Sequence, residues 1–242
     1  MENNMDNKYS FKIRLRTSDF DCNRKIKPSA ILDLFQEAAG AHAKLIKSGF
    51  EDLLERGLLW VITKEKFEVL KSLQMHSEVV VHTWPLEPSR VTFEREYLIE
   101  NTDGEVLVKG TSEWVIVSAE KRKIVPVKDL YPLETYVADK MFEGKFVKAL
   151  DFTDADFENK VNPSFCDLDM NRHVNNIKYA DYVLNAVDLK GRSINFFQLD
   201  FHKEVKKDDE ICLLVADCGE QILAKGLNSA GEKMFCCEIK AK

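Results

Sequence analysis

The chain contains an internal repeat, which restricts the folds open to it more than any other feature of the sequence. The segment SDFDCNRKIKPSAILDLFQEA, which begins at Ser18, resembles CDLDMNRHVNNIKYADYVLNA, which begins at Cys166. The residues shared at equivalent positions are Asp19, Asp21, Asn23, Arg24, Asp33 and Ala38 in the first copy, and Asp167, Asp169, Asn171, Arg172, Asp181 and Ala186 in the second. Such agreement indicates duplication of one structural unit.

Later landmarks of the two copies recur in the same order but at shorter spacing. The segment 76–78 (HSE) precedes an apolar run as the segment 208–210 (DDE) does. The turn sequence at 101–105 (NTDGE) matches the one at 228–232 (NSAGE). The first copy is therefore expected to carry a longer helix and loop than the second.

Each copy has the pattern of one helix followed by a run of strands. In the first copy, Phe11, Ile13 and Leu15 alternate with polar residues as in a half-buried strand. Apolar residues then recur at helical spacing after Pro28, which suits a first helical turn, and Gly49 suits a C-terminal cap. Further strands are expected at 60–62, 79–84, 91–99 and 106–117, and in the second copy a helix at 176–186 and strands at 196–201, 211–216, 222–227 and 234–239.

The first helix is apolar on more than one side, notably at Ile31, Leu32, Leu34 and Phe35. Such a helix is best buried inside a curved sheet. The sequence therefore predicts an α+β fold of two tandem hot-dog domains, each a long helix wrapped by a curved antiparallel sheet. The expected boundaries are 1–130 for the N-terminal domain, 131–151 for a linker that matches neither copy, and 152–242 for the C-terminal domain.

Composition excludes several functional classes. The formal net charge of −6 argues against a generic nucleic-acid binder. The sequence has no basic start followed by an apolar run and no stretch as apolar as a membrane span, so we expect a cytoplasmic protein. The six cysteines form no CxxC pair and no zinc-like cluster with histidine, so we expect reduced thiols, no metal and no cofactor. Cys166 is expected to be a small buried residue.

The polar loop of the second copy carries the residues most suited to catalysis. It contains Asp169, Asn171 and His173, whereas the first copy has Lys25 where His173 stands. Only the second copy thus has, at this position, an imidazole that can bind a proton near neutral pH. Asn171 and His173 can donate hydrogen bonds to a carbonyl beside a helix N-terminus, and Asp169 can fix either partner. The alternative is that the aspartate and asparagine only make turn and cap bonds.

The segment DLDMNRHVNNIKY, 167–179, resembles the D-x-N-x-H-V-N-N-x-x-Y signature of the acyl-acyl carrier protein (ACP) thioesterases. The segment LDFHKEV, 199–205, is similar to a second family segment, L-[DE]-Y-R-R-E-C. The resemblance covers essentially the whole chain, and it implies that Asp169, Asn171, His173 and Glu204 occupy the family's catalytic positions. The chain departs from the family at Val205, where a cysteine is frequent. A cysteine nucleophile at that position is therefore excluded.

The direction of Glu204 is open in the sequence. Simple alternation along a strand places Glu204 with His202 and Asp200 on a polar or solvent-exposed face, opposite the apolar residues of the strand. Only a bulge or the end of the strand would turn Glu204 toward His173. An ordinary surface glutamate is the alternative.

The resemblance implies hydrolysis of fatty acyl-ACP to free fatty acid and ACP, which ends chain elongation. The partner would be ACP carrying a phosphopantetheine-linked acyl chain, and the chain would lie beside the helix of the first hot dog. Glu204 could act as a general base toward water, or Asp169 as a nucleophile. Two other functions stay open, acyl-CoA hydrolysis and acyl binding without catalysis. A homodimer is also open.

Overall fold

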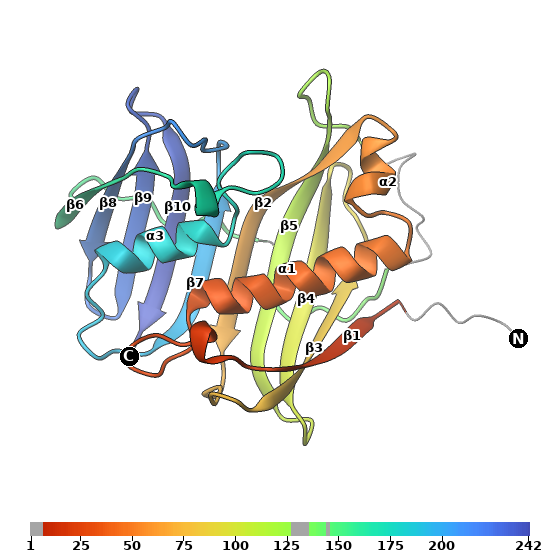
Figure 1. Ribbon diagram of the computed structural model, residues 1–242, viewed down its shortest axis with the longest axis horizontal. Helices are drawn as coiled ribbons and strands as arrows, with labels where there is room; N and C mark the ends of the chain where they lie inside the picture. The colour runs from red at the N-terminus through yellow and green to blue at the C-terminus, as the bar shows by residue number, and fades with distance from the viewer. Residues whose placement is uncertain (1–6, 127–135, 144–145) are drawn as a thin grey trace, which may run out of the picture. The chain divides into compact units, whose positions relative to one another are not determined.

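The structure, a computed structural model, describes residues 7–126, 136–143 and 146–242 (Figure 1). By its internal contacts the chain divides into two compact units, each of which combines a helix with an antiparallel sheet. The N-terminal unit comprises Met1–Thr17, Asp33–Glu65 and Leu70–Phe146, and the C-terminal unit comprises Ser18–Leu32, Lys66–Val69 and Val147–Lys242. No helix in the described ranges is long and apolar enough to cross a membrane.

The N-terminal unit is built on five strands, with the order β1-β3-β4-β5-β2. They are β1 (Tyr9–Arg14), β2 (Leu58–Val69), β3 (Glu78–Pro85), β4 (Thr92–Asn101) and β5 (Val106–Ser118). The predicted turn between β4 and β5 is present, because Asn101 Oδ1 accepts the N–H groups of Asp103 (3.0 Å) and Glu105 (2.9 Å). The chain between β1 and α1 contains a short 3-10 helix, η1 (Thr17–Asp19).

Helix α1 (Pro28–Leu45) lies across this sheet from Asp33 onward (Figure 1). The Phe35 ring stacks on Tyr97 of β4, with ring centroids 4.3 Å apart. Gly110 of β5 makes room for Phe35, since a Cβ atom at Gly110 would lie 2.2 Å from the ring. The predicted burial of the helix on several sides is confirmed, because Ile31, Leu32, Leu34, Phe35 and Ala38 are all at most 5% exposed.

The end of α1 differs from the prediction that Gly49 caps it. The N–H of Ser48 binds the carbonyl of Ala43 (2.8 Å) and that of Lys47 binds the carbonyl of Lys44 (3.2 Å). This is the Schellman pattern, and Lys47 takes the left-handed position with φ of 54°. Gly49 instead precedes a second helix, α2 (Phe50–Leu54), where its N–H binds Asp52 (2.9 Å).

The interior of the N-terminal unit contains several ionisable side chains. Arg95 reaches His42 of α1, at 3.0 Å between Nη1 and Nδ1, and burial together with this guanidinium lowers the pKa of His42 to about 4. Tyr97 shares a hydrogen bond with Ser112 (2.9 Å). Glu65 of β2 is 4% exposed, and burial raises the pKa of its carboxyl to about 8. Glu65 is therefore mostly protonated at neutral pH.

The C-terminal unit has its own five-stranded order, β7-β10-β9-β8-β6. Its elements are β6 (Phe157–Val161), the short 3-10 helix η4 (Phe165–Asp167), α3 (Lys178–Ala186), β7 (Ile194–Phe201), β8 (Ile211–Asp217), β9 (Gln221–Leu227) and β10 (Lys233–Ala241). Tyr179 of α3 packs edge-on against Phe235 and Phe201, with ring centroids at 4.9 and 5.4 Å. The helix has 9 residues against 18 in α1, which confirms that the first copy carries the longer helix.

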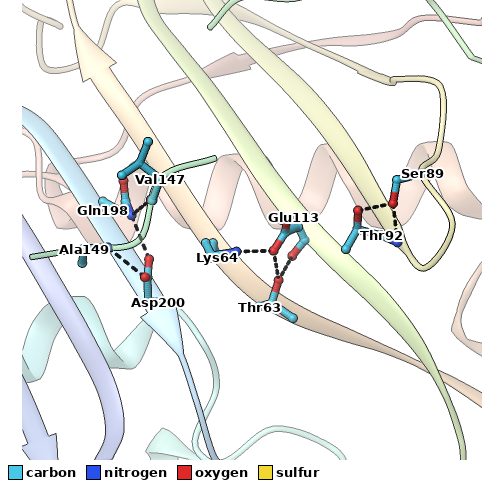
Figure 2. Close-up of polar contacts among 9 residues, drawn as sticks. All are labelled: Thr63, Lys64, Ser89, Thr92, Glu113, Val147, Ala149, Gln198 and Asp200. Atoms are coloured by element: carbon cyan, nitrogen blue, oxygen red, sulfur yellow. Dashed lines mark hydrogen bonds and ion pairs between the residues drawn. The ribbon is translucent and has the colours of Figure 1, made fainter. Parts of the chain in front are cut away.

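The outer face of β7 is polar, as alternation predicts, but it is not open to solvent. Asp200 is 2% exposed and Gln198 is 4% exposed. Figure 2 shows the segment that covers them: the N–H of Ala149 binds Asp200 (2.9 Å), and the amide of Gln198 binds the carbonyl of Val147 (2.8 Å). The covering segment belongs to the predicted linker 131–151, of which 131–135 and 144–145 lie outside the described residues.

Candidate active site

The polar loop of the second copy is a closed turn held by one aspartate. Asp169 Oδ1 accepts the N–H groups of Asn171 (2.8 Å) and His173 (3.1 Å), and the N–H of Asp169 binds the carbonyl of His173 (2.8 Å). Arg172 takes a left-handed conformation with φ of 63°. Asp169 thereby makes the turn bonds that the structural alternative considered from the sequence expects, and these bonds fix the backbone at His173.

The first copy builds the same turn without a histidine. Asp21 Oδ1 accepts the N–H groups of Asn23 and Lys25, both at 2.8 Å, and the N–H of Asp21 binds the carbonyl of Lys25 (2.8 Å). Arg24 has φ of 60°. The duplication thus extends to individual hydrogen bonds. Because the turn forms in both copies, the aspartate has a structural role in each, whatever else it does in the second.

His173 lies beside Glu204. The Nε2 atom of His173 is 3.4 Å from Oε2 of Glu204, and the two side chains are 24% and 37% exposed. Strand β7 ends at Phe201, so the strict alternation that would carry Glu204 away no longer holds. The end of the strand, one of the two devices considered from the sequence, is what places the carboxylate next to the imidazole.

Two backbone contacts join the segments that carry this pair. His173 forms an isolated antiparallel bridge with Lys206, and the N–H of Val174 binds the carbonyl of Val205 (2.8 Å). On one side the contacts involve His173 and the next residue, and on the other side the two residues that follow Glu204. The separation of His173 and Glu204 is therefore set by main-chain geometry and does not depend only on flexible side chains.

Tyr179 of α3 contacts the segment that carries Glu204. Its side chain is buried, at 3% exposed, and its hydroxyl is hydrogen-bonded to the backbone of Val205. Burial, opposed only in part by this bond, keeps the pKa of Tyr179 above its ordinary value, so the hydroxyl is protonated at neutral pH. The sequence signature contains Tyr179 but does not indicate what the residue does. The structure brings its hydroxyl to Val205, which directly follows Glu204.

Asn171, Cys166 and Val205 differ in their exposure to solvent. Asn171 is exposed, and its side-chain amide lies 3.4 Å from Asp169 Oδ2. Cys166 is exposed, so the expectation of a buried thiol was wrong; it lies in η4, on the outer part of the loop. Val205 is fully buried and fills the position of the frequent family cysteine. Within the described ranges, no cluster of His, Cys, Asp or Glu side chains could hold a metal ion.

The first copy lacks a counterpart of the carboxylate. Counted from the ends of the equivalent strands, Val69 of β2 and Phe201 of β7, the residue that corresponds to Glu204 is Ser72. Lys25 likewise stands in place of His173. Both His173 and Glu204 therefore lack a counterpart in the first copy, although its turn is intact.

Sequence profiles of known families match both halves of the chain. The acyl-ACP thioesterase N-terminal domain matches residues 6–133, and the acyl-ACP thioesterase C-terminal domain matches residues 151–234. A chloroplastic acyl-[acyl-carrier-protein] hydrolase of Cuphea viscosissima is 26% identical over 80% of the chain and 51% of its own length. A chloroplastic palmitoyl-acyl carrier protein thioesterase of Arabidopsis thaliana is 24% identical over 85% of the chain and 54% of its own length. The chain spans about half the length of these relatives.

Solved structures share the fold over nearly the whole chain. A crystal structure of an acyl-ACP thioesterase from Bacteroides thetaiotaomicron superposes with a TM-score of 0.88 at 18% identity, covering 98% of this chain and 99% of that one. The 12:0-ACP thioesterase from Umbellularia californica gives a TM-score of 0.85 at 22% identity, covering 98% and 97%. These matches confirm the predicted α+β fold of two tandem hot dogs.

Proposed function

Because the chain belongs to the acyl-ACP thioesterase family, we propose that it hydrolyses fatty acyl-ACP to free fatty acid and ACP. The observation that carries the proposal is the pairing of His173 with Glu204 at 3.4 Å, in the one copy that retains both residues. The first copy forms the same turn but has Lys25 and Ser72 in place of this pair.

In the proposed reaction, Glu204 acts as a general base toward water. It takes a proton from the water as the water oxygen attacks the thioester carbonyl carbon. The tetrahedral intermediate then collapses, the C–S bond breaks, and the phosphopantetheine sulfur takes the proton from Glu204 as it leaves. His173 and Asn171 hold the water or the carbonyl oxygen by hydrogen bonds, and N–H groups near the start of α3 stabilise the oxyanion.

Asp169 and Cys166 are the alternative nucleophiles. Asp169 Oδ1 already accepts two backbone N–H groups, so an attack by this residue would come from Oδ2, which lies 3.4 Å from the Asn171 amide. Cys166 is exposed on the outer part of the loop. The test compares Glu204→Gln with Cys166→Ser by rapid-mixing kinetics and mass analysis of trapped enzyme. Loss of turnover in the serine variant, or an acyl group on Asp169 or Cys166, would overturn the water mechanism.

The same proposal assigns roles to the two domains. The C-terminal domain, 152–242, holds the catalytic residues, and the N-terminal domain, 1–130, holds the acyl chain beside α1. Hydrolysis rates across ACP-linked chains of graded length would test the second role, because substitutions beside α1 should change the preferred length and leave the reaction otherwise intact. A chain-length profile unchanged by such substitutions would contradict it.

The other functions considered from the sequence become outcomes of one assay. A single acyl group is presented on ACP and on CoA, and both turnover and ligand release are measured. Faster turnover of the CoA ester would favour an acyl-CoA hydrolase, and retention of the ligand without hydrolysis would favour a binding module. A place in fatty acid biosynthesis, a cytoplasmic location and a homodimer remain predictions, to be tested by product analysis, cell fractionation and light scattering.

A further inference from the structure

Two large apolar side chains on the catalytic loop are unusually exposed. Phe165 is 78% exposed and Met170 is 82% exposed, the highest values among the large apolar residues of the described chain. Single exposed apolar residues are common on protein surfaces. Here, however, both lie in the loop that leads into His173. The N–H of Leu168 binds the carbonyl of Phe165 (3.3 Å), which ties η4 to the turn.

The repeat supplies an internal control for this exposure. With Ser18 aligned to Cys166, the residue in place of Phe165 is Thr17 and the residue in place of Met170 is Cys22. The first copy forms the same turn with these smaller side chains. The turn therefore does not require a phenylalanine or a methionine, and their presence only in the copy with the acid–base pair indicates a role in function.

Two exposed lysines close to Glu204 are also found only in the second copy. Lys206 and Lys207 are exposed and lie two and three residues after Glu204. The backbone of Lys206 forms the isolated β-bridge with His173. The corresponding residues of the first copy, counted from the strand ends, are the uncharged Gln74 and Met75. Carboxylates on the same turn offset part of this charge: Asp208 and Glu210 are exposed, and Asp209 accepts the N–H of Lys206 (2.7 Å).

We propose that Phe165, Met170, Lys206 and Lys207 form the docking surface for the acidic carrier protein. The inference rests on the proposed function and names the surface through which its substrate is delivered. Exposed apolar side chains serve as anchors that become buried on binding, and neighbouring cations speed the encounter with an acidic partner. An acyl group on a short pantetheine arm, without the protein, would not need this surface.

The experiment uses one acyl group attached either to ACP or to free pantetheine. The apolar variant combines Phe165→Thr with Met170→Ser, and the charge variant combines Lys206→Gln with Lys207→Gln. For each variant kcat/KM on acyl-ACP should fall on the order of tenfold, which corresponds to about 1.4 kcal/mol. On acyl-pantetheine kcat/KM should change less than about twofold. The charge variant should also flatten the decrease of kcat/KM with salt seen for acyl-ACP.

Matched controls remove similar groups elsewhere on the surface. Phe157→Thr removes an exposed phenylalanine of β6, and Lys121→Gln with Lys123→Gln removes two exposed cations from the turn after β5. Both controls should keep normal kcat/KM on both substrates. Equal losses on both substrates in the docking variants would show damage to the catalytic loop and overturn the proposal, as would unchanged kcat/KM on acyl-ACP. A wild-type enzyme inactive on both substrates would instead refute the proposed function itself.

Discussion

The two polar loops, 19–27 and 167–175, have the same backbone and different chemistry. Both close on an aspartate that accepts two N–H groups, and both place an arginine in the left-handed region. Only the second adds an imidazole and faces a carboxylate. The comparison separates what the turn needs from what a reaction needs, because a residue present in both loops can be explained by folding alone.

The sharpest test of this comparison removes the proposed acid–base pair, His173 and Glu204. His173→Ala and Glu204→Gln should each lower kcat by roughly 10²–10⁴, the range for a positioned acid–base group. Their unfolding midpoints should stay close to that of the wild type, since both side chains are partly exposed. Steady-state hydrolysis of acyl-ACP and urea denaturation give the two readouts. Near-normal turnover in a folded variant would remove the residue from the site.

The next prediction concerns the interiors of the two copies. Glu65 is buried in the first copy where the second has Phe197, counted from the strand ends. The pKa of Glu65 is raised from 4.5 to about 8, so the folded state holds a proton that the unfolded chain releases. Its contribution to stability is therefore complete below pH 4.5 and is lost as the pH rises to about 8, by an amount on the order of a few kcal/mol.

Glu65→Gln should remove this dependence and raise the stability at pH 8 relative to the wild type. Urea denaturation of both proteins at pH 5 and pH 8 measures how much the free energy of unfolding of each one changes with pH. The exposed Glu120→Gln is the control and should leave the pH dependence unchanged. A glutamine variant with the wild-type slope would mean that Glu65 ionises normally in the folded protein.

A smaller effect is expected where α3 supports the junction. Tyr179→Phe deletes the hydroxyl bonded to Val205 and loosens the segment that carries Glu204. We expect a decrease in kcat of roughly tenfold, comparable to the loss of one hydrogen bond, with little change in KM. The control is Tyr182→Phe. Tyr182 lies on the same helix, α3, and its hydroxyl donates a hydrogen bond to Asp167 of η4 (3.0 Å). Equal decreases in both variants would argue for a general effect of α3.

The smallest effect tests whether the two loops are interchangeable. Lys25→His in the His173→Ala background moves the imidazole from the second loop to the first. Ser72 still stands where the second copy has the Glu204 carboxylate. Turnover should remain at the level of His173→Ala alone. Recovered hydrolysis would show that the copies are chemically equivalent and would overturn the assignment of a single active centre.

The repeat made the helices, the turns and the loop of the second copy predictable from sequence. Other features were not predictable, because they depend on where an element ends or on a contact with a distant segment. Alternation along β7 predicts an outward Glu204, but the strand ends at Phe201. The same alternation predicts an exposed Asp200, but a distant segment covers it through Ala149. Similarly, Gly49 suits a helix cap by composition, yet Lys47 adopts the left-handed conformation first.

The division of contacts limits how such proteins can be recombined. The unit that contains His173 also includes Ser18–Leu32 and Lys66–Val69, which precede the linker by a long stretch of sequence. A chimera joined at residue 151 would therefore pair a C-terminal domain with contact segments from a different parent. Chimeras between relatives should fold better when 18–32 and 66–69 are transferred together with the C-terminal half. Each compact unit then comes from a single parent, although its segments are separated in the sequence.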